Sequence, residues 1–190
     1  MDDRLYHEYL RRRSVIALLY RRYYLYPWLA RFLKGKVLDV GCGIGDFLWF
    51  YKDVVGLDRN PYNVEYCRAR GFEVHLVVGR KYPFEDGFFD SAVMDNVLEH
   101  IVDPASVLAE TYRVLRPLGT LIVGVPGIRG YDSDPDHKRY YDEDLLVERL
   151  EAAGFQSKAM LHVPFKSRFL NRTARQYCIY GIFQRPASSN

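Results

Sequence analysis

Val37-Leu38-Asp39-Val40-Gly41-Cys42-Gly43-Ile44-Gly45-Asp46-Phe47 is the most informative segment of this 190-residue chain. An apolar strand leads into a loop with glycines at alternate positions, and a helix is predicted to begin at Gly45. Glycines allow positive φ angles and let a ligand approach the backbone closely. In a parallel α/β sheet this kind of turn lies at the carboxyl ends of the strands, where ligands bind.

Short apolar segments alternate with helical segments after this turn. Strands are predicted at 36–40, 54–58, 73–78, 89–94 and 120–125, and helices at 45–51, 61–70, 104–115 and 142–153. Apolar strands separated by helices indicate a parallel sheet covered on both faces. Residues 158–164 and 176–184 favour two further strands in an antiparallel hairpin at one edge. The predicted fold class is α/β, a doubly wound, mostly parallel seven-stranded sheet.

The first 35 residues are predicted to form a separate helical arm. Residues 3–33 show apolar positions at helical spacing, with a break expected near Pro27 and an end at Gly35. The predicted organisation is therefore an arm at 1–35, a main domain at 36–185 and a flexible tail at 186–190.

Charge is distributed unevenly along the chain, although the net charge is only +3. Residues 1–36 hold nine basic and three acidic residues, and residues 152–190 hold six basic and no acidic ones. The middle of the chain is correspondingly acidic. Basic ends are either ordinary solvated surface or a means of holding an anionic partner such as a phosphate, a nucleic acid or a membrane surface.

The three cysteines, Cys42, Cys67 and Cys178, show neither disulfide nor metal-ligand spacing. We therefore expect no metal site and a reducing, cytoplasmic location. The apolar run Val15–Tyr20 is far shorter than the roughly 20 residues that span a bilayer, and no signal-peptide cleavage site follows it.

Two ligand classes fit a glycine turn followed by a strand that ends in an acid. Asp58 ends the second predicted strand, where a carboxylate can accept hydrogen bonds from both hydroxyls of a ribose. The glycines follow a G-x-G-x-G order instead of the dinucleotide order G-x-G-x-x-G. Asp46, in the first turn of the expected helix, would repel a pyrophosphate. With Asp39 before the loop, a cationic amino-acid ligand such as the methionine part of S-adenosylmethionine suits the site better.

These features resemble the class I S-adenosylmethionine-dependent methyltransferases, in the broad group that includes quinone and small-molecule enzymes. The segment VLDVGCGIG at 37–45 resembles the first motif of that family, and Asp58 resembles its ribose-binding acid. Further resemblances, in family order, are YPFEDGFFD at 82–90, DNVLEH at 95–100, RVLRPLG at 113–119, HKRYY at 137–141 and AGF at 153–155. The resemblance covers about residues 36–155 and implies a Rossmann-like methyltransferase sheet.

The resemblance implies S-adenosyl-L-methionine as cofactor and a methyltransferase activity. It implies that the arm at 1–35 is a substrate cap. The residues that it assigns to the cofactor are Asp39, Gly41, Cys42, Gly43, Gly45, Asp58, Arg59, Asp95, Asn96 and Val97. The candidate catalytic residues are His100, after the cofactor loop, and His137 and Tyr140, in the loop after the fifth strand. One departure concerns the adenine: Val78 or Gly79 stands where the family usually has an acid.

We predict a small-molecule acceptor, methylated at oxygen, and specifically a sugar or glycan precursor. The arginine- and tyrosine-rich arm and the end of the chain resemble methyltransferases of polysaccharide and lipopolysaccharide gene clusters. The basic ends would then receive a phosphorylated or nucleotide-linked sugar. The alternatives are a quinone or other aromatic acceptor, a structured RNA, or a non-catalytic cofactor-binding module. The pattern leaves open the oligomeric state and a membrane-surface contact by residues 1–35.

Overall fold

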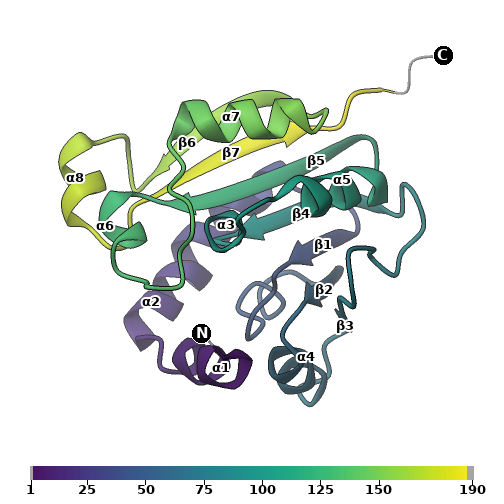
Figure 1. The fold of residues 1–190 in the computed structure, drawn as a ribbon, viewed down its shortest axis with the longest axis horizontal. Helices are drawn as coiled ribbons and strands as arrows, with labels where there is room; N and C mark the ends of the chain where they lie inside the picture. Colours follow the sequence, from purple (N-terminus) through teal and green to yellow (C-terminus); the bar gives the residue numbers. More distant parts are fainter. Residues whose placement is uncertain (1, 188–190) are drawn as a thin grey trace.

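The computed structural model describes residues 2–187 and is built around one seven-stranded sheet (Figure 1). The strand order is β3-β2-β1-β4-β5-β7-β6. The strands are β1 (Val37–Val40), β2 (Val54–Asp58), β3 (Val74–Leu76), β4 (Phe89–Asp95), β5 (Leu115–Pro126), β6 (Gln156–Val163) and β7 (Cys178–Gln184). Neighbouring strands from β3 to β5 pair in parallel, whereas β7 is antiparallel to both β5 and β6. The predicted fold class and its antiparallel edge are confirmed.

Helices flank the sheet, and the chain begins with a series of short helical segments. These are α1 (Asp3–Arg11), α2 (Val15–Tyr20), the π-helix η1 (Arg21–Leu25), α3 (Tyr26–Leu29) and the 3₁₀ turn η2 (Ala30–Phe32). The later ones are α4 (Pro61–Arg68), the 3₁₀ turn η3 (Leu98–His100), α5 (Ala105–Val114), α6 (Ile128–Tyr131), α7 (Glu143–Ala152) and α8 (Arg168–Thr173). Among residues 2–187, no helix combines the length and apolar character needed to cross a bilayer.

The core has two halves because neighbouring residues of a strand face opposite sides of the sheet. Leu38 and Ala92 pack on the side of α5 and α7, in the cluster that contains Leu108 and Leu146. Val37 and Val93 pack on the other side, where the cluster includes Leu25, Tyr26 and Leu29 of the arm. The arm is therefore part of the core, because its buried face covers one side of the central strands.

Two sequence-based expectations about helices are wrong. Residues 45–51, expected to be a helix, form a series of turns, in which Tyr51 N donates to Phe47 O at 3.0 Å. The arm breaks at Arg12–Ser14 and not near Pro27, because Pro27 occupies the first turn of α3, where its missing N–H costs nothing. The tail expected at 186–190 lies largely outside the described residues.

Candidate functional site

A cavity of about 350 Å³ lies at the carboxyl ends of β1, β2 and β4. This volume is typical of a small-molecule site. The sheet side of the wall comes from the glycine turn and from the residues that follow β2 and β4. The remaining wall comes from the arm and from the loop after β5. Its members in those two segments are Asp3, Tyr6, Leu10, Arg13, Arg21, Tyr26, Asp136 and Lys138.

The glycine turn places backbone directly on the cavity. Gly41, Gly43 and Gly45 have φ angles of +71°, +55° and +86°, in the left-handed region that disfavours other residues. A Cβ on Gly41 would lie 2.7 Å from Cγ2 of Val97, so the turn and the loop after β4 fit together only without a side chain there. Gly41 and Cys42 both donate their N–H to Leu57 O, which ties the turn to β2.

Asp58, the last residue of β2, braces the turn while facing the cavity. Its carboxylate accepts hydrogen bonds from Gly43 N at 2.8 Å and from Asn60 N at 2.7 Å. The side chain is 6% exposed and lies on the cavity wall. Each carboxylate oxygen can accept more than one hydrogen bond, so Asp58 retains capacity for the hydroxyls of a ligand.

Six aspartates line the cavity, and four of them, Asp39, Asp46, Asp58 and Asp95, lie on its sheet side. Burial raises the pKa of Asp39 well above its ordinary value, and the nearby Asp95 and Asp58 raise it further. Among the described residues no hydrogen bond or ion pair compensates the Asp39 carboxylate, and its burial disfavours ionisation, so a cation bound beside it would stabilise the charged form. Such a wall favours a ligand that carries positive charge.

The arm is fixed over the cavity by polar contacts from end to end. His7 Nδ1 donates to Asn63 Oδ1 on α4 at 2.8 Å, and Asn60 Nδ2 donates to Asp3 O at 2.6 Å. Farther along, Arg13 forms an ion pair with Asp46 at 2.5 Å. These contacts hold α1 against the amino end of α4 and close one side of the cavity.

Arg21 enters the cavity wall from η1 and pairs with Asp95 at the end of β4. Asp95 also accepts a hydrogen bond from Tyr180 Oη at 2.7 Å, and Arg21 donates to Tyr26 Oη at 3.0 Å. The side chains of Arg21 and Asp95 are only 17% and 7% exposed. A buried charge must be paired to be tolerated, so this network connects the arm to the sheet at the site.

His100 is the candidate base that faces the cavity. It is the last residue of η3. Its Nε2 lies 3.5 Å from Tyr6 Oη, and its Nδ1 lies 3.4 Å from the Asp136 carboxylate. Burial lowers the pKa of His100 below its ordinary value, and the neighbouring His137 lowers it further. The imidazole is therefore neutral near pH 7 and can accept a proton.

His137 and Glu99 lie behind His100. The rings of His100 and His137 have centroids 4.6 Å apart. His137 Nδ1 lies 2.7 Å from Tyr131 O, so it must donate there, which leaves Nε2 directed toward Glu99 Oε1 at 3.9 Å. Glu99 is fully buried, which raises its pKa well above the ordinary value, and its carbonyl accepts from Lys138 N at 2.6 Å. The pair fixes the loop after β5 beside His100.

Glu99, His100 and His137 place donor atoms within 4.8 Å of one another. Metal ligands around a zinc-sized ion lie closer together, with bonds of about 2.0–2.2 Å. Glu99 Oε1 lies 3.9 Å from His137 Nε2, beyond hydrogen-bond distance, and among the described residues neither carboxylate oxygen of Glu99 has a hydrogen-bond partner. Burial, which raises the pKa of Glu99, favours the neutral acid beside the two histidines.

The structure brings most of the predicted site residues to this cavity. Its wall includes Asp39, Gly41, Cys42, Gly43, Asp58, Arg59, Asp95, Asn96, Val97 and His100. Gly45 lies just outside the lining, in the same turn, and His137 stands behind His100. Tyr140 is not part of the cavity wall, since its ring packs edge-on against Tyr131 with centroids 5.6 Å apart.

The cavity fits S-adenosylmethionine on the properties of its own residues. The uncompensated carboxylate of Asp39 suits a cationic ligand, and Asp58 is placed to accept hydrogen bonds from a ribose. Gly41 and Gly43 line the cavity without side chains, so a ligand meets backbone directly there. Val78, at the position of the family's adenine-binding acid, is 79% exposed and contributes no carboxylate.

Comparisons with known proteins agree with this geometry. Residues 38–123 match the family model described as a methyltransferase domain. A protein of Mycolicibacterium smegmatis, described as a probable S-adenosylmethionine-dependent methyltransferase, is 35% identical over 152 residues, which cover 73% of this chain and 59% of that protein. The chain spans between about a third and three fifths of the first two curated relatives that it matches.

Solved structures share the fold. A Thermotoga maritima S-adenosylmethionine-dependent methyltransferase, described as a possible histamine N-methyltransferase, superimposes with a TM-score of 0.74 at 23% identity and covers 96% of this chain and 97% of its own. The [4+2]-cyclase SpnF superimposes with a TM-score of 0.69 at 21% identity, over 86% of this chain and 80% of its own. Because the second is described as a cyclase, the fold alone does not define the reaction.

Proposed function

Since this chain carries a class I S-adenosylmethionine-dependent methyltransferase domain, we propose that it transfers a methyl group to a hydroxyl of a small molecule. The observation that carries the proposal is the acid-walled cavity between the glycine turn and His100. S-adenosylmethionine supplies a methyl group already activated on a sulfonium. The protein's remaining tasks are to position the two reactants and to accept the proton of the hydroxyl.

Each part of the cavity then has a defined task. Asp39 offers charge to the cationic methionine end of the cofactor, and Asp58 accepts hydrogen bonds from its ribose. His100, neutral near pH 7, takes the proton of the acceptor hydroxyl. His137 positions His100 by packing its ring against the His100 ring. Tyr140 influences the site only indirectly, through its contact with Tyr131. The arm at 1–35 serves as the cap over the acceptor.

The acceptor that we propose is a phosphorylated or nucleotide-linked sugar. Arg59 and Lys138 lie on the cavity wall, where their cationic groups can pair with a phosphate. The second candidate is an aromatic or quinone acceptor, favoured by Tyr6, Tyr26 and Phe47 in the same wall. We also propose a reducing, cytoplasmic setting, in line with three free cysteines.

Calorimetric titration with S-adenosylhomocysteine tests the cofactor assignment, with NADH as the control. We expect saturable binding of S-adenosylhomocysteine and none of NADH, because a pyrophosphate beside the glycine turn would meet the buried carboxylates of Asp39 and Asp58. Labelled S-adenosylmethionine with panels of nucleotide-sugars, glycans and quinones then identifies the acceptor. Binding without transfer to any panel would favour the cofactor-binding module, and binding of neither ligand would reject the assignment.

Replacing His100 with glutamine should lower the turnover number by about 10²–10⁴-fold, the usual contribution of a general base. Affinity for S-adenosylhomocysteine should change little. In the parent enzyme, kcat/KM should fall as the pH drops through the pKa of His100, which lies below about 6.5, because His100 then gains a proton. The variant should not show this decrease of kcat/KM at low pH. A variant with the parental pH profile would show that another group removes the proton.

A further inference from the structure

The helix α2 is unusual because none of its six residues is buried, although its sequence, VIALLY, is apolar. The exposed fractions are 68% for Val15, 78% for Ile16 and 49% for Leu19, and Tyr23 in the following turn is 72% exposed. Ile16, Leu19 and Tyr23 lie one, four and eight residues after Val15, a spacing that puts the four side chains on one face of the helical arm. Contiguous exposed apolar surface of this kind marks an interaction site.

The charged side chains of the arm on either side of this face are all positive. Arg12 and Arg22 are exposed on either side of it, and the chain holds no aspartate or glutamate between residues 9 and 38. Two copies of the face could not associate without bringing these arginines together. Its partner must therefore combine an apolar interior with a negatively charged surface.

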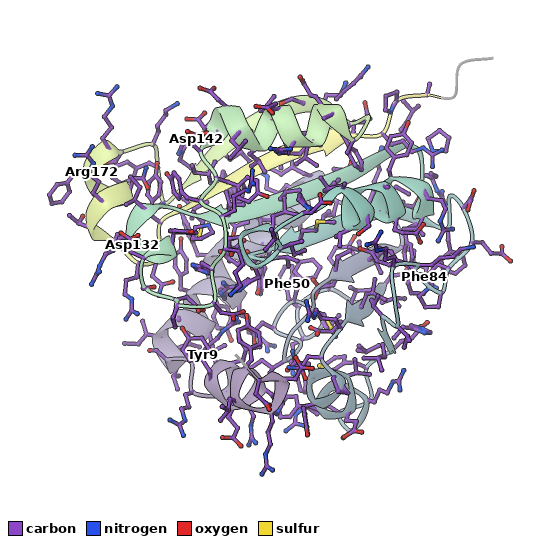
Figure 2. The ribbon with its side chains drawn as sticks, viewed as in Figure 1. Tyr9, Phe50, Phe84, Asp132, Asp142 and Arg172 are labelled. Atoms are coloured by element: carbon purple, nitrogen blue, oxygen red, sulfur yellow. The ribbon has the colours of Figure 1, made fainter. Side chains whose placement is uncertain are left out.

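A second element at the same end of the molecule has the same character. Figure 1 shows α8 and α2 at the left end of the fold, and Figure 2 shows Arg172 on α8 at that end. Phe165 and Phe169, before and within α8, are 62% and 73% exposed, and Lys166 and Arg168 beside them are exposed. No acidic residue occurs in the chain after Glu151. Lys166 is paired with Glu143 of α7 at 2.7 Å, so Arg168 and Arg172 carry the remaining positive charge of this element.

We propose that α2 and the start of α8 form a docking surface for a lipid bilayer that contains anionic lipids. Aliphatic and aromatic side chains enter the boundary between headgroups and acyl chains, and the flanking arginines pair with lipid phosphates. A nucleic acid fits less well, because Val15, Ile16 and Leu19 cannot stack on bases as aromatic rings do. The arm that docks is also the arm that walls the cavity, since Arg13 and Arg21 stand at the two ends of α2.

Co-sedimentation of the full chain with vesicles tests the docking surface directly and does not depend on the methyltransferase activity. We expect binding to vesicles of phosphatidylcholine mixed with phosphatidylglycerol, little binding to phosphatidylcholine alone, and a bound fraction that falls as salt is added. Ile16→Asp should weaken partitioning about tenfold or more, because it removes a large apolar side chain from the lipid. Arg12→Glu with Arg22→Glu should weaken it by a similar factor, and mainly on the anionic vesicles.

Val102→Asp is the matched control, because Val102 is 70% exposed and lies away from α2 and α8 in the sequence. It should bind vesicles like the parent, and circular dichroism should show all variants folded. Equal binding by Ile16→Asp and Val102→Asp would overturn the proposal. So would binding to RNA in place of vesicles, or a concentration-dependent dimer in light scattering that Ile16→Asp abolishes.

Discussion

Asp58→Ala should reduce the affinity for S-adenosylhomocysteine by about 10²–10⁴-fold. Two hydrogen bonds from the ribose to a charged acceptor are each worth about 1.5–3 kcal/mol, and both are lost. The loss extends to the protein itself, because the N–H groups of Gly43 and Asn60 lose their acceptor. The glycine turn then relaxes away from the shape that receives the ligand, which adds to the effect.

Calorimetry on the parent and the variant measures this loss, with circular dichroism to establish that the variant is folded. Glu65→Ala is a suitable control, since Glu65 is an exposed acid on the neighbouring helix α4 and outside the cavity wall. It should bind like the parent. If Asp58→Ala retained full affinity, the ribose would have to lie elsewhere and the assignment of the cavity would be wrong.

The strands were predictable because their signal is local. The segment Val54–Asp58 agrees with the expected strand at both ends, and Val37–Val40 differs by one residue. Both strands are buried on two faces, so their apolar runs leave a continuous pattern in the sequence. Residues 45–51 were mispredicted because Phe47 and Phe50 are spaced as in a helix, but they pack against Tyr26 of the arm from a series of turns.

The site was predictable only where a motif carries it. The glycine turn, Asp58 and the loop after β4 follow recognisable patterns, and they form the sheet side of the cavity. The motif does not indicate, however, which of its glycines has space for a side chain. A side chain on Gly43 would meet only Leu10 Cδ1, at 3.4 Å, whereas one on Gly41 would collide with Val97. That difference depends on a contact between segments more than 50 residues apart in the chain.

The arm was predicted to be a substrate cap, but its individual cavity residues were not assigned, because their partners lie far away in the sequence. Tyr6, Arg13 and Arg21 line the cavity, but nothing around them in the chain marks them as site residues. The same holds for Asn60, whose side chain caps α4 and also holds the backbone of α1. One signal was present: arginines at both ends of an apolar segment indicated an unusual arm, but not which carboxylates they meet.

The buried Arg21–Asp95 pair gives the largest expected effect on stability. Replacing Arg21 with methionine, which keeps an unbranched apolar stem but not the charged guanidinium, should lower the free energy of unfolding by about 3–5 kcal/mol. The reason is that Asp95 would remain buried and unpaired, close to Asp39, whose burial already disfavours ionisation. The carboxylate would keep only the hydrogen bonds from Tyr180 and from the neighbouring Asn96.

Urea denaturation of Arg21→Met, Asp95→Asn and the double variant measures this coupling. The double variant should recover much of the loss, because a neutral amide at position 95 no longer requires a cation and can still accept from Tyr180. Arg22→Met is the control, since Arg22 is exposed on the same turn, and it should stay within about 0.5 kcal/mol of the parent. Additive losses in the double variant would mean that the two charges do not act on each other, and that the arm is held over the cavity by its apolar face alone.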